Sequence, residues 1–211
     1  MSEISIRIAG PEDAPALLEL YAYYVRHTAI TFEYDMPSLE EFTARVQGTL
    51  EKYPYLAAVE GGAIVGYAYA GPFHPRAAYG WAAEATIYLS HGCRHQGLGK
   101  RLYRALEEIL RMQGVLNLNA CIAVPEADDE YLTRNSLGFH THLGYRLVGE
   151  FTQCGYKFDR WYNMVWMEKL LGPHTVPAAP VRPFPAVRAE ADHVLRSCRR
   201  FPYHKETPRP A

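Results

Sequence analysis

The chain opens with a regular alternation of hydrophobic and polar residues. Residues 4–8 (ISIRI) alternate with a period of two, which predicts a half-buried strand. Over residues 11–25 the apolar side chains return every third or fourth position, which predicts a helix with proline and two acids in its first turn. A second helix is predicted to begin at Ser38, because Ser38 and Glu41 have the spacing of a capping box.

The next part of the chain predicts a β-hairpin followed by alternating strands and helices. Two strand-like runs, 55–59 and 64–70, flank a Glu-Gly-Gly turn. Beyond them the pattern predicts strands over 81–89, 116–124, 145–151 and 163–168, and helices over 100–112 and 131–143. We therefore expect an α/β protein with one well-buried core.

Composition excludes several function classes. The 211 residues are 48% hydrophobic and 21% charged, which is typical of a globular domain. The net charge of −1 gives no electrostatic reason to expect a nucleic-acid or membrane partner. No apolar run approaches the roughly 20 residues of a membrane span, and the N-terminus has no pattern of a secretory signal. Four scattered cysteines without a CxxC pair indicate free thiols, so we expect a cytoplasmic protein. No cluster of metal-binding side chains is recognisable, so no metal is expected.

The composition changes at Gly172. Residues 172–211 hold eight of the fifteen prolines, and seven Lys and Arg against three Asp and Glu. We predict a Pro-rich, basic tail over 172–211 that is disordered or lies along the surface, with one helical piece over 189–200. The globular domain is predicted over 1–171.

A glycine-rich loop, Arg94-His95-Gln96-Gly97-Leu98-Gly99, joins a predicted strand to a predicted helix. Such a turn offers backbone N–H groups and the helix dipole to an anionic phosphate. A dinucleotide-binding loop is excluded because Leu102 stands where the third glycine is needed. A P-loop is excluded because Arg94 and Arg101 occupy two of its required positions. A purely structural turn remains the alternative.

The spacing Arg94-x-x-Gly97-x-Gly99 resembles the R/Q-x-x-G-x-G/A motif of the GCN5-related N-acetyltransferase (GNAT) superfamily, over most of residues 4–170. Four further segments resemble its phosphinothricin acetyltransferase branch, namely 71–73, 84–90, 139–145 and 155–161. The resemblance implies an α/β (α+β) fold with a mixed, mostly antiparallel twisted sheet and helices on both faces. It also implies acetyl transfer from acetyl-CoA to the primary amine of a small amino-acid-like substrate, by direct attack in a ternary complex.

The resemblance also implies which residues hold acetyl-CoA. A strand that splays from its neighbour would offer its backbone to the pantetheine arm. The expected contacts are Ile87, Tyr88 and Leu89 for that arm, Arg94, His95, Gln96, Gly97, Leu98, Gly99 and Lys100 for the pyrophosphate, and Asn135 and Ser136 on the following helix.

Two residues are candidates for proton transfer. Glu84 is the predicted general base, because the substrate ammonium must lose a proton before it attacks. A strand-end glutamate in a salt bridge is the alternative. His140 is the predicted acid for the leaving thiolate, and a packing histidine is its alternative. Cys93 suggests a covalent route, but no base is recognisable beside it.

The acceptor site is predicted from two loops. Arg76 would bind a carboxylate, Tyr79 and Phe73 would form walls, and Phe32 and Glu33 would close the site. His74 stands where related enzymes tend to carry Arg or Lys, which weakens the carboxylate site.

Two other functions remain open. One is a protein or peptide N-terminal acetyltransferase, and the other is a non-catalytic acyl-CoA-binding relative that uses the tail as an interaction arm. A homodimer is implied by the resemblance alone.

Overall fold

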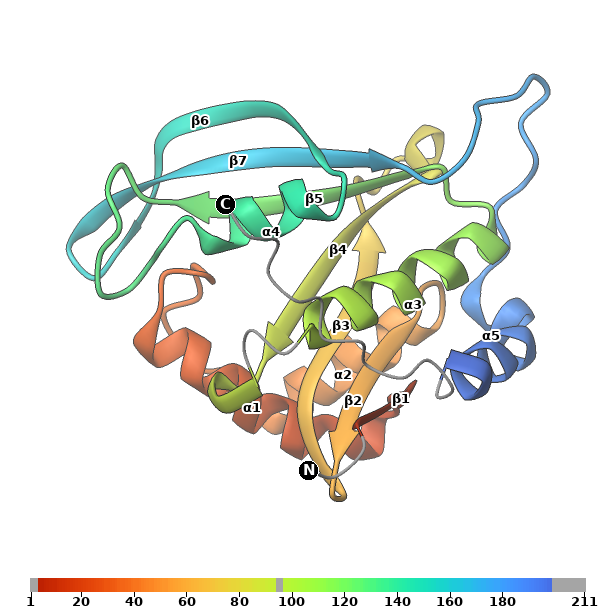
Figure 1. Cartoon of the computed structure of the whole chain (residues 1–211), viewed down its shortest axis with the longest axis horizontal. Coiled ribbons are helices and arrows are strands. Elements are labelled where there is room, and N and C mark those ends of the chain that lie inside the picture. Colours follow the sequence, from red (N-terminus) through yellow and green to blue (C-terminus); the bar gives the residue numbers. More distant parts are fainter. Residues whose placement is uncertain (1–3, 94–96, 199–211) are drawn as a thin grey trace, which may run out of the picture.

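The computed structural model describes residues 4–93 and 97–198 (Figure 1). Three loop residues of the predicted pyrophosphate site, Arg94, His95 and Gln96, lie outside the described residues. The helices and strands, in chain order, are β1 (Ile4–Ile8), α1 (Ala14–His27), α2 (Leu39–Leu50), β2 (Tyr55–Glu60), β3 (Ala63–Pro72), β4 (Ala82–Leu89), α3 (Leu98–Gln113), β5 (Asn117–Val124), α4 (Asn135–His142), β6 (Arg146–Lys157), β7 (Arg160–Leu170) and α5 (Phe184–Cys198).

The strands form one mixed sheet in the order β1-β2-β3-β4-β5-β7-β6. Only the β4–β5 pair is parallel, and the other five pairs of the described sheet are antiparallel. Helices α1 and α2 cover one face of its first half, while α3 and α4 lie on the other face (Figure 1). The predicted architecture, a mostly antiparallel sheet with helices on both faces, is confirmed.

The sheet opens between its two parallel strands. Residues Ala82–Glu84 pair with Asn117–Asn119, and the pairing then stops although β4 continues to Leu89 and β5 to Val124. Beyond Glu84, β4 stays paired with β3 on its other side. The two parallel strands diverge from this point (Figure 1), so the inner edge of β4 has no strand beside it.

The closing hairpin is longer than predicted. Strand β6 runs to Lys157 and β7 starts at Arg160, where the sequence predicted strands over 145–151 and 163–168. Residues Phe158 and Asp159 make the turn with positive φ of 53° and 57°. The alternation that predicts a strand is lost because the register of the pair shifts between Phe151 and Gly155.

The predicted helix over 131–143 is shorter, because α4 spans only Asn135–His142. Two carboxylates, Asp128 and Asp129, accept hydrogen bonds from the backbone N–H groups of the residues that precede α4. Asp129 accepts from the N–H of Tyr131 and of Leu132, both at 2.8 Å. Such side-chain bonds compete with helix formation and delay its start.

The last helix corrects the prediction for the tail. Helix α5 starts at Phe184 instead of Ala189, and it packs on α3 and β1. Its side chains Phe184, Val187, Ala191 and Leu195 are buried in the main core. This part of the segment is therefore neither disordered nor merely superficial, and the division at residue 171 stays a prediction.

Candidate active site

Both glycines that open α3 are favoured by the geometry. Gly97 precedes the helix with φ of 72°, in the left-handed region that favours glycine. At Gly99 a Cβ atom would lie 3.0 Å from the ring of Phe139 on α4, a tighter contact than most Cβ atoms make, so glycine eases the close approach of the two helices. The N–H groups of Leu98, Gly99 and Lys100 begin the helix, where no intrahelical acceptor is available. They form the part of the predicted phosphate site that the structure describes.

The backbone of β4 presents an edge toward the opening in the sheet. The N–H of Leu89 donates to the hydroxyl of Tyr24 at 3.0 Å, and that hydroxyl donates to the carbonyl of Leu89 at 2.5 Å. Both groups of Leu89 therefore point away from β3. In a strand, the N–H and C=O groups of every second residue point to the same side. Those of Ile87 therefore also point away from β3, in the part of β4 that is no longer paired with β5. Tyr88 instead turns its side chain toward α1.

Glu84 lies at the point where β4 and β5 diverge. It is the register partner of Gly71 on β3 and of Asn119 on β5. Its side chain is half-buried, and burial raises the pKa of its carboxyl group. The carboxylate makes no hydrogen bond or ion pair with another residue that the structure describes. The salt-bridged alternative is therefore not found among these residues.

His140 is buried, and both of its ring nitrogens are engaged. Nδ1 lies 2.8 Å from the carbonyl of Ser136, which can only accept, so Nδ1 carries the hydrogen. Nε2 then accepts from the hydroxyl of Tyr103 at 2.8 Å. Burial lowers the pKa of His140 to about 4. A ring that is neutral at pH 7 and whose lone pair is occupied argues against the predicted role of general acid.

The other predicted cofactor contacts on α4 open that helix. Asn135 is exposed, and its N–H donates to the hydroxyl of Thr133 at 3.4 Å. Ser136 is half-buried and holds His140 through its carbonyl. Both residues lie on the helix whose Phe139 contacts Gly99, so α4 borders the first turn of α3.

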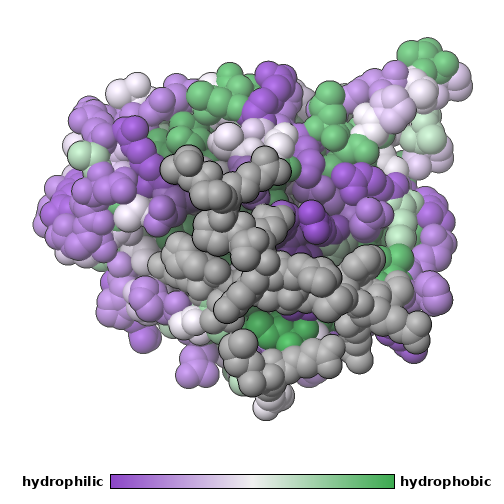
Figure 2. All heavy atoms as spheres, viewed as in Figure 1, coloured by the Kyte–Doolittle hydropathy of each residue, from purple (hydrophilic) through white to green (hydrophobic). Residues whose placement is uncertain are grey.

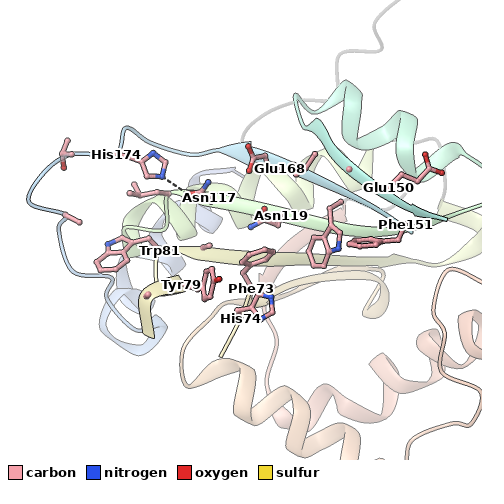
Figure 3. Close-up of a pocket in the computed structure, with 18 residues that line it drawn as sticks. Phe73, His74, Tyr79, Trp81, Asn117, Asn119, Glu150, Phe151, Glu168 and His174 are labelled. Carbon is pink, nitrogen blue, oxygen red and sulfur yellow. Dashed lines mark hydrogen bonds between the residues drawn. The ribbon is translucent and has the colours of Figure 1, made fainter. Parts of the chain in front are cut away.

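A pocket of about 790 Å³ lies on the sheet face opposite α3 and α4 (Figure 3). It contains three of the six predicted acceptor residues, Phe73, His74 and Tyr79. The ring of Phe73 meets Tyr79 edge-on at 5.8 Å and Trp166 edge-on at 5.4 Å. Arg76 is exposed beside this group but is not among the described lining residues.

The pocket also contains residues that the sequence did not single out. They share one face of β5 and β7 or follow β7, and they include Asn117, Asn119, Trp166, Glu168 and His174. Alternation along the predicted strands could have placed the β5 and β7 residues on one face. It could not have shown which face is open.

Phe32 and Glu33 lie apart from the residues that line this pocket. Phe32 packs on Gly155, where a Cβ atom would lie 2.2 Å from the ring. Glu33 pairs with Arg45 at 2.7 Å. The loop is held by Lys157, whose Nζ donates to the carbonyls of Thr28 and Thr31. The predicted acceptor residues thus fall into two groups, and Phe32 and Glu33 do not line the pocket.

Two of the thiols, those of Cys93 and Cys121, are not activated as nucleophiles. Burial raises the pKa of Cys93 and raises that of Cys121 to about 12. Within the described ranges, no group of three or more His, Cys, Asp or Glu side chains could hold a metal ion. Among the helices that the structure describes, none is both long and apolar enough to cross a membrane.

Comparison with known proteins gives consistent relatives. The profile of the Acetyltransferase (GNAT) domain matches residues 6–166. Phosphinothricin N-acetyltransferase of Streptomyces viridochromogenes is 31% identical over 181 residues, which cover 85% of this chain and 94% of that protein. The L-methionine sulfoximine/L-methionine sulfone acetyltransferase of Pseudomonas paraeruginosa is 32% identical, over 80% of this chain and 95% of that protein. Among solved structures, a phosphinothricin acetyltransferase of Sinorhizobium meliloti in complex with AcCoA superposes with a TM-score of 0.76 at 31% identity, covering 86% of this chain and 97% of that one.

Proposed function

The chain belongs to the GNAT acetyltransferase family, and from this premise we propose that it acetylates the primary amine of a small amino-acid-like molecule with acetyl-CoA as donor. The observation that carries the proposal is Glu84. A half-buried carboxylate without a partner among the described residues stands where the two parallel strands diverge, beside an open pocket. The relatives named for phosphinothricin and methionine sulfoximine support an amino-acid-like acceptor.

The residues present fit acetyl-CoA. The N–H groups of Gly97 to Lys100 suit a pyrophosphate, and the outward backbone of Ile87 suits the amides of a pantetheine arm. The glycine at position 99 keeps this end of α3 free of a side chain. When bound, acetyl-CoA supplies an activated thioester carbonyl. Arg94, His95 and Gln96 stay predicted contacts.

We propose that Glu84 is the general base that accepts the proton from the amine. The acceptor arrives as an ammonium ion, which has no lone pair with which to attack. The raised pKa of Glu84 makes its carboxylate a stronger base than an exposed glutamate, and it can accept the proton directly or through a water. Holding the deprotonated amine and the thioester side by side then contributes much of the rate.

We propose that His140 orients Tyr103 rather than donating a proton. Its neutral ring accepts the Tyr103 hydroxyl, and the pair links α4 to α3. The thiolate needs little help in leaving, since a thiol with a pKa near 8.5 is a fair leaving group.

A homodimer and a cytoplasmic location remain proposals. Exposed apolar side chains on β6 and β7 that do not line the pocket, namely Leu147 and Trp161, support a second copy as their cover. The net charge of −1 supports the proposal that nucleic acid is not a partner.

A thiol-release assay tests the proposed function. Purified protein is incubated with acetyl-CoA and a panel of free L-amino acids, phosphinothricin, methionine sulfoximine and a short peptide. We expect thiol release that depends on a free amino acid or analogue. Release with the peptide alone would favour the N-terminal acetyltransferase. Binding of acetyl-CoA without release on any amine would favour a non-catalytic relative.

A further inference from the structure

The segment that follows β7 forms one end of the pocket. We call residues 173–179 the C-terminal strap. Three of its residues, His174, Thr175 and Ala178, line the pocket. Figure 3 shows His174 and Trp81 at one end and Glu150 and Phe151 toward the other. The strap lies beyond residue 166, where the match to the family profile ends.

Two hydrogen bonds fix the strap to the strands beneath it. His174 Nε2 donates to the side-chain oxygen of Asn117 at 2.8 Å. The indole N–H of Trp81 donates to the carbonyl of Ala179 at 2.7 Å. The chain after the strap is held by the buried ring of Phe184 on α5. The strap is thus anchored at both ends.

The register of β4 and β5 gives the distance between the strap and Glu84, the proposed base. Asn119 is the register partner of Glu84, and Asn117 lies two residues earlier on the same face of β5. Two residues of a strand span about 7 Å. Since His174 is hydrogen-bonded to Asn117, the strap lies about 7 Å beyond Asn119 along β5. An amino acid whose amine lies at Glu84 would reach the strap with the end of a long side chain.

The lining of the pocket is aromatic. Five rings face it, those of Phe73, Tyr79, Trp81, Phe151 and Trp166. No Lys or Arg is found among its described lining residues, whereas two carboxylates are. Glu168 is paired with Arg146, and Glu150 accepts a hydrogen bond from Asn163 at 2.6 Å. An anionic side-chain head placed here would find two carboxylates and no Lys or Arg among the described lining residues, which is unfavourable.

We propose that the C-terminal strap is the end wall of the acceptor pocket, and that this pocket takes the uncharged, apolar side chain of an amino acid of aromatic or long aliphatic size. The inference rests on the proposed function. It differs from that function by selecting against acceptors with an anionic head, such as phosphinothricin. Trp81 and His174 are then specificity-determining residues, and neither takes part in proton transfer.

A comparison of acceptor substrates tests which class of side chain the pocket takes. We measure kcat/KM for acetyl-CoA-dependent thiol release with L-phenylalanine, L-methionine, L-alanine and phosphinothricin. We expect phenylalanine and methionine to exceed both alanine and phosphinothricin by about tenfold or more. Turnover of all four with phosphinothricin preferred would overturn this inference and leave the proposed function intact. No turnover on any of them would overturn both.

Two variants test the strap. Trp81→Phe keeps an aromatic ring but removes the bond to Ala179, and His174→Ala removes the bond to Asn117. We expect each to raise the ratio of KM for phenylalanine to KM for alanine by about tenfold, because only the longer side chain reaches the strap. Arg188→Ala, which changes an exposed residue of α5, is the control and should leave the ratio unchanged. A wild-type ratio in both strap variants would overturn the inference.

Discussion

Glu84 differs from the other buried carboxylates in what surrounds it. Glu107 is more deeply buried, yet it pairs with Lys169 at 2.8 Å and with Arg111 at 3.2 Å. A buried carboxylate usually requires such partners, because desolvation destabilises its charged form. Glu84 has none among the described residues, and burial raises its pKa. A residue kept in this state is better suited to proton transfer than to stability.

Replacing Glu84 with glutamine tests the base directly. We expect kcat to fall by about 10²-fold or more, with KM for acetyl-CoA near its wild-type value. A base works only when deprotonated, so wild-type kcat/KM should decline as the pH falls through the raised pKa of Glu84. The variant should lack this decline. Full kcat in Glu84→Gln at neutral pH would remove Glu84 from the mechanism.

A glutamine at position 140 tests whether His140 gives a proton. With a pKa of about 4, His140 is neutral at pH 6 to 8, so a requirement for its protonated form would make activity fall as the pH rises through about 4. We expect His140→Gln to lose about 1 to 3 kcal/mol of unfolding free energy through its buried partners, and kcat to change only a few-fold.

The readouts are kcat between pH 6 and 8 and urea unfolding, with Tyr103→Phe as a matched variant that removes only the hydroxyl bonded to His140. A hundredfold loss of kcat in a folded His140→Gln protein would restore the general acid.

At the scale of elements, the site depends on the point at which the pairing of β4 with β5 ends. Alternation predicted both β4 and β5, and it placed Glu84 in the first of them. It could not predict the opening, because a strand has the same pattern whether or not its neighbour continues beside it. The start of α2 was predictable from local chemistry, and the Ser38 side chain does accept the N–H of Glu41 at 3.1 Å. Glu41 bonds Arg45 instead of completing the capping box.

Gly99→Ala tests the close approach of α3 and α4. The new methyl group would lie 3.0 Å from the Phe139 ring, so the ring must move by a few tenths of an ångström. We expect a loss of about 1 to 3 kcal/mol in unfolding free energy and a raised KM for acetyl-CoA. Gly138→Ala is the control, because a Cβ atom there meets nothing within 4 Å and alanine favours helix. Equal stability and KM in the two variants would contradict this account of the loop.

At the scale of the whole molecule, the tail was the main error of the sequence analysis. Proline content and basic charge indicated an appendage, yet Phe184, Val187, Ala191 and Leu195 recur at helical spacing and are buried. Prolines at the start of a helix do not oppose it. The amide of Gln113 binds the carbonyls of Lys52 and Arg182, joining α3, the loop before β2 and the tail. Figure 2 shows polar and apolar residues mixed over the coloured part of this face.

Phe184→Ala measures how much α5 contributes to the fold. The ring is fully buried, so we expect a loss of about 3 to 5 kcal/mol in unfolding free energy. Arg188→Ala, on the exposed side of the same helix, should change it by less than about 0.5 kcal/mol. Urea unfolding of both variants gives the comparison. A loss below about 1 kcal/mol for Phe184→Ala would mean that the tail is only loosely attached.

The central claim is that the chain moves an acetyl group from acetyl-CoA directly to a free amine. It is tested most directly by mass spectrometry of both products after reaction with isotope-labelled acetyl-CoA and an amino acid. The account predicts the label on the amine of the amino acid and an unmodified protein chain. Label retained on the protein, or acetyl-CoA left intact in the presence of every amine, would contradict it.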